Sequence, residues 1–349
     1  MSDVSSYTYD EIIHQPIAWA ESIAVTKKSG PLLSNLRQRD FNHVVCLGCG
    51  SAYYVASATA VLIKSLARLQ SAAYPASEFL INPELLLPRE SSTSLVIAFS
   101  RSGKTTETLA AVKDLRKRGC PIINVIVYPD TPLHELGDIN ISIPTAREIG
   151  VAQTRSFVSM YVAGIVLSMI FAERHDLLEA VESLPSTGRH IIDNFHELVR
   201  TVGEDDELQQ FFFLGSGPRF PLACEASLKL KEISLSASEP FHFLEFRHGP
   251  MSMVDERTLI IGLLSDRSRQ LENAVLEDMR ALNGRTFSLG ERDADVSFNS
   301  GLPEPMQGPL YMPLLQLLAY YRAIKLGLDP DVLKNLTPYI EIELPESGQ

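Results

Sequence analysis

The chain is poor in cysteine, in tryptophan and in long apolar runs. It has four cysteines and one tryptophan among 349 residues, too few cysteines for a disulfide scaffold, and this scarcity favours a reducing compartment. No run reaches the roughly 18 apolar residues of a membrane span, and the N-terminus lacks the basic and apolar segments of a secretory signal. The sequence therefore predicts a cytoplasmic protein that makes no membrane contact.

Basic residues are also in the minority, with 31 Lys and Arg against 43 Asp and Glu and a net charge of −12. Non-specific binding to nucleic acid depends on a basic surface, so this balance argues against nucleic acid as a partner. A small anionic ligand remains compatible, because a single site can be locally positive in an acidic protein. The 45% of apolar residues can build the cores of two ordinary domains.

A diverged internal repeat organises the chain. Residues 44–51 and 211–218 are each an apolar run that ends in Gly-x-Gly, with equivalent residues 167 positions apart, and a second apolar run follows at 95–99 and at 259–264. Strands that alternate with helices form parallel sheets, so the sequence predicts the α/β class with two three-layer domains. Neither repeat continues as G-x-G-x-x-G, so support for dinucleotide binding is weak.

The remaining apolar patterns complete the expected organisation. Strands are expected at 122–128 and 139–143, a buried helix from about Ser156, and a helical connection at 177–202. Pro16 is compatible with the first turn of a helix in the segment 9–29, and 339–344 has the pattern of a strand. The expected divisions are a helical arm at 1–36, domains at 37–180 and 198–330, and a tail at 331–349.

The segment 95–106 places a hydroxyl-rich turn between an apolar strand and a helix. Free N–H groups and the positive end of the helix dipole meet at such a turn, which suits a phosphate. Two alternatives remain: hydroxyls that only cap the helix, and a nucleotide P-loop, which Gly103-Lys104-Thr105 resembles although Ala98 stands where the first glycine belongs.

The helix expected after the second Gly-x-Gly carries Glu225, Lys229 and Glu232 at positions i, i+4 and i+7, on one face. A carboxylate base with a lysine neighbour could move a proton and stabilise charge on a substrate oxygen. The alternative is a solvated face with salt bridges.

Two loops carry further candidate groups. The segment 239–250 contains His248 before Gly-Pro, where an imidazole could act as an acid or base near neutral pH. Bracing of the loop is the alternative, and metal binding has little support because the spacing lacks the helical His-Glu-x-x-His pattern. The polar segment 148–157 could line a site or cap the helix that follows, and Cys46 and Cys49 fit strand-end packing better than redox chemistry.

Together these strings resemble the SIS (sugar isomerase) family. The matches are 47–51, 99–105, 148–157, 225–234 and 247–250, in the family's order, and they cover about residues 9–345. The arm at 11–16 is similar to the segment before the isomerase half of glucosamine–fructose-6-phosphate aminotransferase, and AgaS-type isomerases are also similar. The resemblance implies two tandem flavodoxin-like SIS domains, a homodimer with sites near the subunit interface, and phosphosugar chemistry without metal, nucleotide or other cofactor.

The resemblance also implies roles for individual residues. Glu232 corresponds to the base that moves a proton between C1 and C2, Lys229 to its partner, and His248 to a ring-opening histidine that reaches the neighbouring subunit's site. The corresponding substrate-binding residues are Cys49, Gly50, Ser51, Ser100, Arg101, Ser102, Thr105, Val151, Gln153 and Glu225.

Two departures limit the resemblance. The sequence shows no glutaminase domain, and Pro338 stands where the aminotransferase has its Schiff-base lysine, with Lys334 offset by four positions. We therefore expect an aldose–ketose isomerase that acts on a phosphorylated sugar or aminosugar and releases an amine or ammonia. A phosphosugar-binding sensor without catalysis is the alternative.

Two expectations concern the assembly. Asp266, in the second half's counterpart of the hydroxyl-rich turn, would repel phosphate, so we expect one phosphate site per chain. The three phenylalanines of the 239–250 loop are expected to bury apolar surface against a partner subunit; they are Phe241, Phe243 and Phe246.

Overall fold

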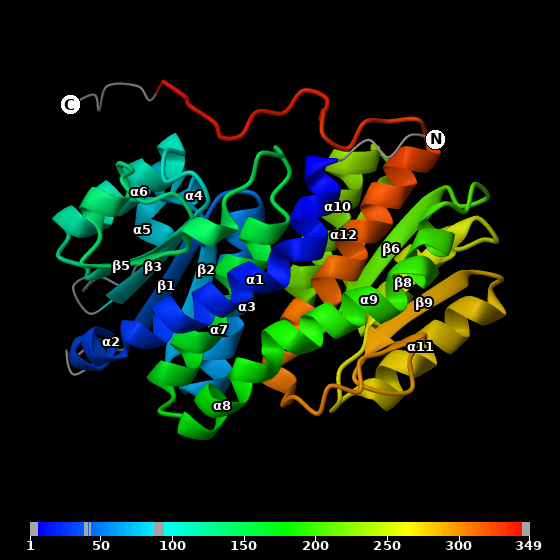
Figure 1. Ribbon diagram of the computed structural model, residues 1–349, viewed down its shortest axis with the longest axis horizontal. Helices are drawn as coiled ribbons and strands as arrows, with labels where there is room; N and C mark the ends of the chain where they lie inside the picture. The colour runs from blue at the N-terminus through cyan, green and yellow to red at the C-terminus, as the bar shows by residue number, and fades with distance from the viewer. Residues whose placement is uncertain (1–5, 38–40, 42, 87–93, 344–349) are drawn as a thin grey trace.

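A computed structural model describes residues 6–37, 41, 43–86 and 94–343 of the chain. These residues form two parallel five-stranded sheets with helices on both faces (Figure 1). The prediction of an α/β protein with two tandem three-layer domains is therefore confirmed.

Both sheets have the same strand order when the strands are counted within each half. The first sheet runs β2-β1-β3-β4-β5 and the second β7-β6-β8-β9-β10, which is the flavodoxin order. The first contains β1 (His43–Gly48), β2 (Gln70–Pro75), β3 (Ser94–Ser100), β4 (Ile122–Ile126) and β5 (Ile139–Ser142). The second contains β6 (Gln210–Gly215), β7 (Ala237–His242), β8 (Thr258–Leu263), β9 (Arg285–Gly290) and β10 (Val296–Ser297).

Long helices fill the space between the two sheets and join both domains in one core (Figure 1). These helices are α1 (Tyr7–Lys28), α3 (Ser51–Leu66), α7 (Arg155–Phe171), α9 (Leu184–Gly203), α10 (Arg219–Ser234) and α12 (Gly308–Lys325). Smaller apolar clusters on the outer sheet faces pack against α4 and α6 in one domain and α11 in the other. The remaining helices are α2 (Gly30–Arg37), α4 (Glu78–Ile81), α5 (Pro83–Leu86), α6 (Thr106–Lys117), α8 (His175–Ala180) and α11 (Arg269–Ala281).

Pro16 lies inside α1 and not in its first turn, so that expectation is wrong. The helix begins at Tyr7, where the Ser6 side chain accepts a hydrogen bond from the Tyr9 N–H. Proline has no N–H to bond the carbonyl four residues back, which is that of Ile12. The side-chain amide of Gln15 donates to this carbonyl at 2.8 Å. A neighbouring side chain thus replaces the missing backbone bond.

Two further local expectations need correction. The segment expected as a loop from residue 239 begins with an edge strand, β7, and Pro240 is tolerated there because an edge strand leaves some N–H groups unpaired. Residues 339–343 form no strand but an irregular path across the top of the molecule (Figure 1). Leu344 lies outside the described residues.

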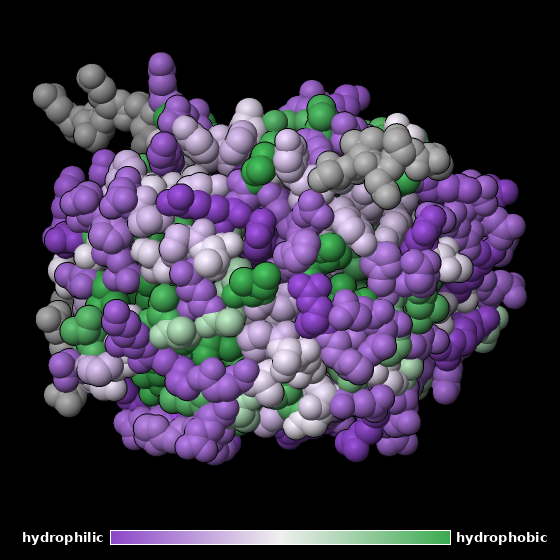
Figure 2. All heavy atoms as spheres, viewed as in Figure 1, coloured by the Kyte–Doolittle hydropathy of each residue, from purple (hydrophilic) through white to green (hydrophobic). Residues whose placement is uncertain are grey.

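The surface is mostly polar, with apolar side chains gathered over α1 and α2. Figure 2 shows this region on the left of the molecule, and Ile17 and Leu32 are exposed there. The most apolar helix, α7, is almost wholly buried, as predicted. Within the described ranges, no helix has the length and apolar character to cross a membrane.

Candidate active site

The site lies where the strand order of the first sheet reverses. Strands β1 and β3 are neighbours, and the helices that follow them, α3 and α6, pack on opposite faces of the sheet. Such a reversal opens a crevice at the carboxyl ends of the strands. The turns 49–51 and 100–105 both lead into this crevice.

The hydroxyl-rich turn is shaped by its own side chains. Gly103 N–H donates to Ser100 Oγ at 3.0 Å, and Lys104 N–H donates to Ser102 Oγ at 3.1 Å. Gly103 has φ +62°, and a Cβ there would lie 2.2 Å from Thr131 Oγ1, so only glycine fits. In this described segment Thr105, the N-cap of α6, makes no side-chain capping bond. Its hydroxyl thus remains available to a ligand, which argues against a purely capping role.

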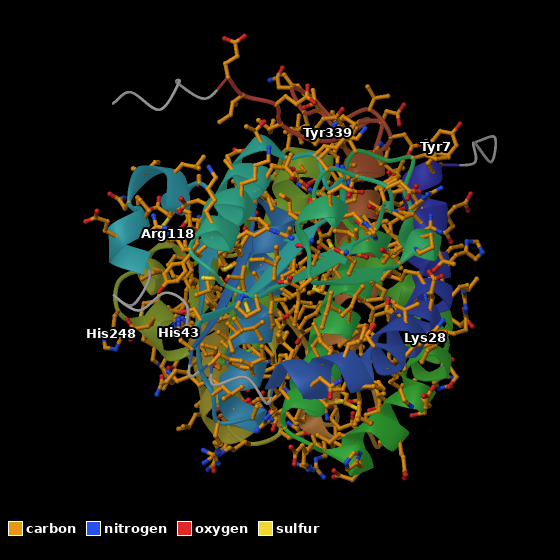
Figure 3. All side chains as sticks on the ribbon, turned by 90° about the vertical axis from the view of Figure 1, so that its left-hand side faces the viewer. Tyr7, Lys28, His43, Arg118, His248 and Tyr339 are labelled. Carbon is orange, nitrogen blue, oxygen red and sulfur yellow. The ribbon has the colours of Figure 1, made fainter. Side chains whose placement is uncertain are left out.

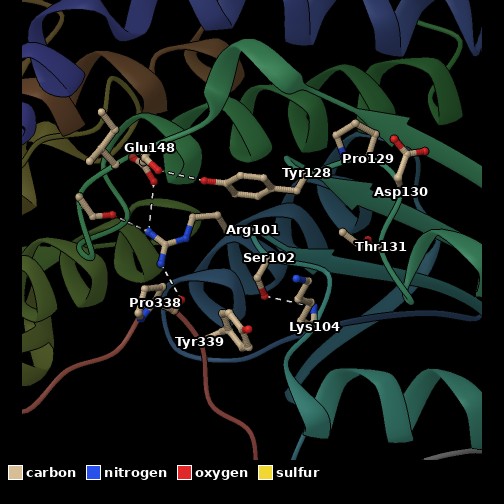
Figure 4. A pocket seen from close by; sticks show the side chains of 12 residues that line it. Arg101, Ser102, Lys104, Tyr128, Pro129, Asp130, Thr131, Glu148, Pro338 and Tyr339 are labelled. Atoms are coloured by element: carbon tan, nitrogen blue, oxygen red, sulfur yellow. Dashed lines mark hydrogen bonds and ion pairs between the residues drawn. The ribbon is translucent and has the colours of Figure 1, made fainter.

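Arg101 joins three segments of the chain and is nearly buried. Its guanidinium donates to the carbonyls of Gly150 at 3.2 Å, Val151 at 2.9 Å and Pro338 at 2.6 Å, and contacts Glu148 (Figure 4). Arg101, expected to bind substrate, lines the site, but these donors already bond acceptors within the protein. Its hydrogen bonds link the polar loop at 148–157 to the C-terminal tail.

Glu148 explains the polar loop that the sequence singled out. Its carboxylate accepts hydrogen bonds from the N–H groups of Thr154 at 2.7 Å and Ser156 at 3.0 Å, at the start of α7. An acidic group at a helix N-terminus satisfies unpaired N–H groups and interacts favourably with the helix dipole. The loop is thereby fixed with Val151 and Gln153 at the cavity.

Helix α10 brings the three predicted charged residues to one place. Lys229 lies between the two carboxylates, 3.5 Å from Glu225 Oε1 and in direct contact with Glu232 Oε2. Glu225 and Lys229 are buried, whereas the Glu232 side chain is 20% exposed. The solvated-face alternative is therefore wrong, and of the two carboxylates Glu232 is the one that a ligand can reach.

Glu225 and Lys229 each shift the pKa of the other. Burial raises the pKa of Glu225 to about 8 against the lowering effect of Lys229. Burial alone would lower the pKa of Lys229, but Glu225 and Glu232 together raise it. Lys229 thus stays a cation beside the exposed carboxylate.

We expect Glu225→Gln to stabilise the fold at pH 8.5 and to change its stability little at pH 5. The folded state raises the pKa of this carboxyl from 4.5 to about 8, so the wild type loses stability as the pH rises through that window, and Gln cannot ionise. The free energy of unfolding should increase by roughly 2–4 kcal/mol at pH 8.5. Denaturant unfolding at both pH values, with the exposed Glu197→Gln as control, measures this. An equal effect at the two pH values contradicts it.

A cavity of about 210 Å³ separates the turns of the first domain from α10. It collects nine of the predicted site residues: Cys49, Gly50, Ser51, Arg101, Thr105, Val151, Gln153, Lys229 and Glu232. Ser100 and Ser102 line a smaller hollow that shares Cys49, Arg101, Thr105 and Gln153 with it. Glu225 lies directly behind Lys229.

The C-terminal tail covers this cavity, which the sequence reading of a strand missed. Residues 335–340 line the cavity, and the Ile340 carbonyl accepts the Thr106 N–H of α6 at 3.3 Å. Lys104 lies over the Tyr339 ring (Figure 4). Pro338, at the position for which the resemblance implies a Schiff-base lysine, lines the site, while Lys334 is exposed and is not among the residues that line these cavities.

His248 is not brought to the site of its own chain. It is exposed, and Figure 3 places it at the left edge of the molecule, away from Tyr339 at the top, which lines the cavity. The expected apolar loop surface is also reduced, because Phe243 and Phe246 are buried in the core of their own domain. Of the three phenylalanines only Phe241 remains partly accessible.

In the second domain, side chains of the protein itself occupy the equivalent of the hydroxyl-rich turn. Ser265 donates its N–H and its hydroxyl to the buried carboxylate of Glu272, at 2.6 and 3.0 Å. Asp266 pairs with Arg269 at 2.7 Å. Carboxylates thus occupy the donors that a phosphate would need, which supports one phosphate site per chain.

The other sequence candidates gain no support. Cys46 and Cys49 are free thiols, and burial raises the pKa of both. Cys49 Sγ and the Thr108 hydroxyl form a hydrogen bond at 3.5 Å, in which either atom could donate, and this bond holds the thiol at the strand end. Within the described residues, no group of three or more His, Cys, Asp and Glu side chains could hold a metal ion.

Known proteins are similar to this chain in sequence. The glutamine–fructose-6-phosphate aminotransferases (isomerizing) of Thermosynechococcus vestitus and Xanthomonas campestris are 30% and 27% identical to 89% and 95% of the chain. The chain spans 53% and 58% of their lengths. It therefore matches about half of each relative.

Solved structures extend the comparison. Glucosamine-6-phosphate deaminase from Thermotoga maritima has a TM-score of 0.78 and 26% identity, covering 96% of this chain and 99% of that one. Tagatose-6-phosphate ketose/aldose isomerase from Escherichia coli has a TM-score of 0.84, 23% identity and coverage of 100% and 99%, and shows the fold. The family model described as "SIS domain" matches residues 37–170 and 207–296, one match on each sheet. This chain belongs to the SIS-domain family.

Proposed function

We propose that this chain is an aldose–ketose isomerase of phosphorylated sugars that releases an amine or ammonia when the substrate is an aminosugar phosphate. The observation that carries the proposal is the accessible Glu232 beside the buried cation Lys229, across one cavity from the turn 100–105. The names of the similar enzymes, an isomerising aminotransferase and a deaminase, support the same chemistry.

In the proposed reaction the sugar phosphate binds at the α6 N-terminus, and the open-chain sugar lies along the cavity. Glu232 takes the proton from the carbon next to the carbonyl or iminium, and Lys229 stabilises the negative charge that develops on the oxygen. The enediol or enolamine then takes the proton back on the neighbouring carbon. The former carbonyl oxygen keeps a proton that the neighbouring hydroxyl or amine gives up, so a new carbonyl or imine forms there. With an aminosugar, water adds to the iminium carbon and the C–N bond breaks. The products are then the keto sugar phosphate and the amine or ammonia.

A sensor without catalysis would need the phosphate turn but not the charged residues of α10. Burying Lys229 between two carboxylates is costly in desolvation, and a stable fold alone does not require it. The same residues distinguish an enzyme from a binding module. The chain is therefore better described as an enzyme, which we propose to act as a homodimer.

A ligand screen tests the proposal directly. Thermal shift is measured with hexose 6-phosphates, aminosugar 6-phosphates, phosphorylated fructosamines, their unphosphorylated parents and ATP with Mg²⁺, followed by isomerisation and ammonia-release assays. A phosphorylated ligand at 100 times its Kd should add about 2.7 kcal/mol of stability. Turnover of such a ligand supports the proposal; stabilisation without turnover would make the protein a sensor, and a response only to ATP a nucleotide-binding protein.

The phosphate turn is tested by the double change Ser102→Ala and Thr105→Ala. We expect the free energy of phosphosugar binding to weaken by about 2–3 kcal/mol, because two hydroxyl bonds to a charged group are lost. Calorimetry measures the affinity, and the α9 pair Ser186→Ala and Thr187→Ala, whose hydroxyls both bond the Ser183 carbonyl, is the matched control. Equal affinity for the wild type and the double variant would place the phosphate elsewhere.

A further inference from the structure

The N-terminal arm touches the site wall through a buried carboxylate. Glu11, on α1, is 3% exposed. Its Oε1 accepts the Ile149 N–H at 2.5 Å and the Gly150 N–H at 3.3 Å. The arm thus grips the backbone of the polar loop at the two residues before Val151, which lines the cavity.

The fit between the arm and the loop is close. A Cβ on Gly150 would lie 2.8 Å from Glu11 Oε2, so a side chain at this position would force the carboxylate to shift. Arg155 of α7 lies 3.8 Å from Glu11 Oε1. Burial, followed by the neighbouring Glu148, raises the pKa of Glu11 to about 7, and the two N–H bonds and Arg155 oppose this shift. An apolar residue here would leave both N–H groups of the loop without this acceptor.

The same loop also binds Arg101. The carbonyls of Gly150 and Val151, which follow the gripped N–H groups, accept two hydrogen bonds from the guanidinium. The same guanidinium holds the Pro338 carbonyl of the tail (Figure 4). A continuous chain of contacts therefore runs from the arm through the loop and Arg101 to the tail that covers the cavity.

The other end of the tail is tied to the same helix. Asp331 accepts the N–H groups of Tyr7 at 2.9 Å and Thr8 at 2.8 Å, at the N-terminus of α1. The tail is thus bonded to the N-terminus of α1 at Asp331 and to Arg101 at Pro338. Helix α1 fixes both attachments.

We propose that Glu11 is a positioning residue, which sets Arg101 and through it the tail over the cavity by holding the loop at 149–151. It touches neither Lys229 nor Glu232. Its loss should therefore loosen the cover of the site while the proton-transfer groups stay in place. The kinetic part of this inference rests on the proposed function; the structural part does not.

The test compares Glu11→Ala with a matched variant on the same helix. Glu21 also accepts a backbone N–H from a neighbouring loop, that of Thr145 at 2.8 Å, but it lies outside the cavity lining. Hydrogen exchange should become at least about tenfold faster at residues 148–151 and 339–342 in Glu11→Ala and unchanged there in Glu21→Ala. Equal exchange in the two variants overturns the proposal, whether or not the protein turns over a phosphosugar.

Kinetics supply the second readout. We expect KM for the phosphosugar found in the screen to rise about tenfold in Glu11→Ala, with kcat within about threefold of the wild type. The variant should lose only the binding free energy that the ground state and the transition state share. Glu11→Gln keeps one acceptor oxygen and should restore KM to within about threefold of the wild type. A fall in kcat at constant KM, or a Gln variant as impaired as Ala, overturns the proposal; absence of turnover in the wild type would instead refute the proposed function and leave the exchange result valid.

Discussion

Replacing Glu232 by Gln should lower phosphosugar turnover by at least about 100-fold and leave its affinity within about threefold. The amide has the shape of the carboxylate but cannot accept the substrate proton, and general base catalysis contributes about 10² to 10⁴ in rate. Glu225 stays 3.5 Å from Lys229. The Glu232 charge contributes to the raised pKa of Glu225, so its loss favours ionised Glu225, the buried cation retains a charged partner, and the fold should survive. Rapid-quench turnover and calorimetry measure the two quantities.

Exchange of solvent deuterium into the substrate separates this role from general damage. A base that moves a proton between neighbouring carbons exposes it to solvent, so wild-type enzyme should label C1 or C2, and the Gln variant should not. The exposed Glu245→Gln of the same domain is the control. Normal labelling in Glu232→Gln would show that another group is the base.

The fold could be predicted where a strand is buried on both faces. Strands β1, β3, β6 and β8 lie inside their sheets and read as apolar runs, as expected for a parallel sheet. The edge strands β2 and β7 are half-buried and contain small, polar or proline residues, so they have no such pattern. The sequence could not show them, and it assigned part of β7 to a loop.

The site likewise has features that the sequence could reveal and features that it could not. The i, i+4, i+7 spacing on α10 and the turn 100–105 are local patterns, and the structure brings them to one cavity. The role of Arg101 could not be read, because its acceptors are backbone carbonyls at Gly150, Val151 and Pro338 that no side-chain pattern marks. The resemblance of the tail to a known family was the one signal for its place at the site.

The position of His248 decides whether a site is built from one chain or two. It lies far from the cavity of its own chain (Figure 3), although the family resemblance places this histidine at a ring-opening step. Both observations are satisfied if the imidazole reaches the cavity of a second copy. In that case every site takes Glu232 from one protomer and His248 from the other.

Mixing two inactive variants, Glu232→Gln and His248→Ala, should then restore activity. After subunit exchange half of the dimers are mixed, and each has one complete site made of the intact Glu232 of one chain and the intact His248 of the other. The expected recovery is about a quarter of the wild-type activity for a twofold dimer. Co-purification through different affinity tags establishes exchange, and each variant mixed with itself is the control. Confirmed exchange without recovered activity would mean that His248 does not serve the partner's site, and a monomer in solution would exclude the shared site altogether.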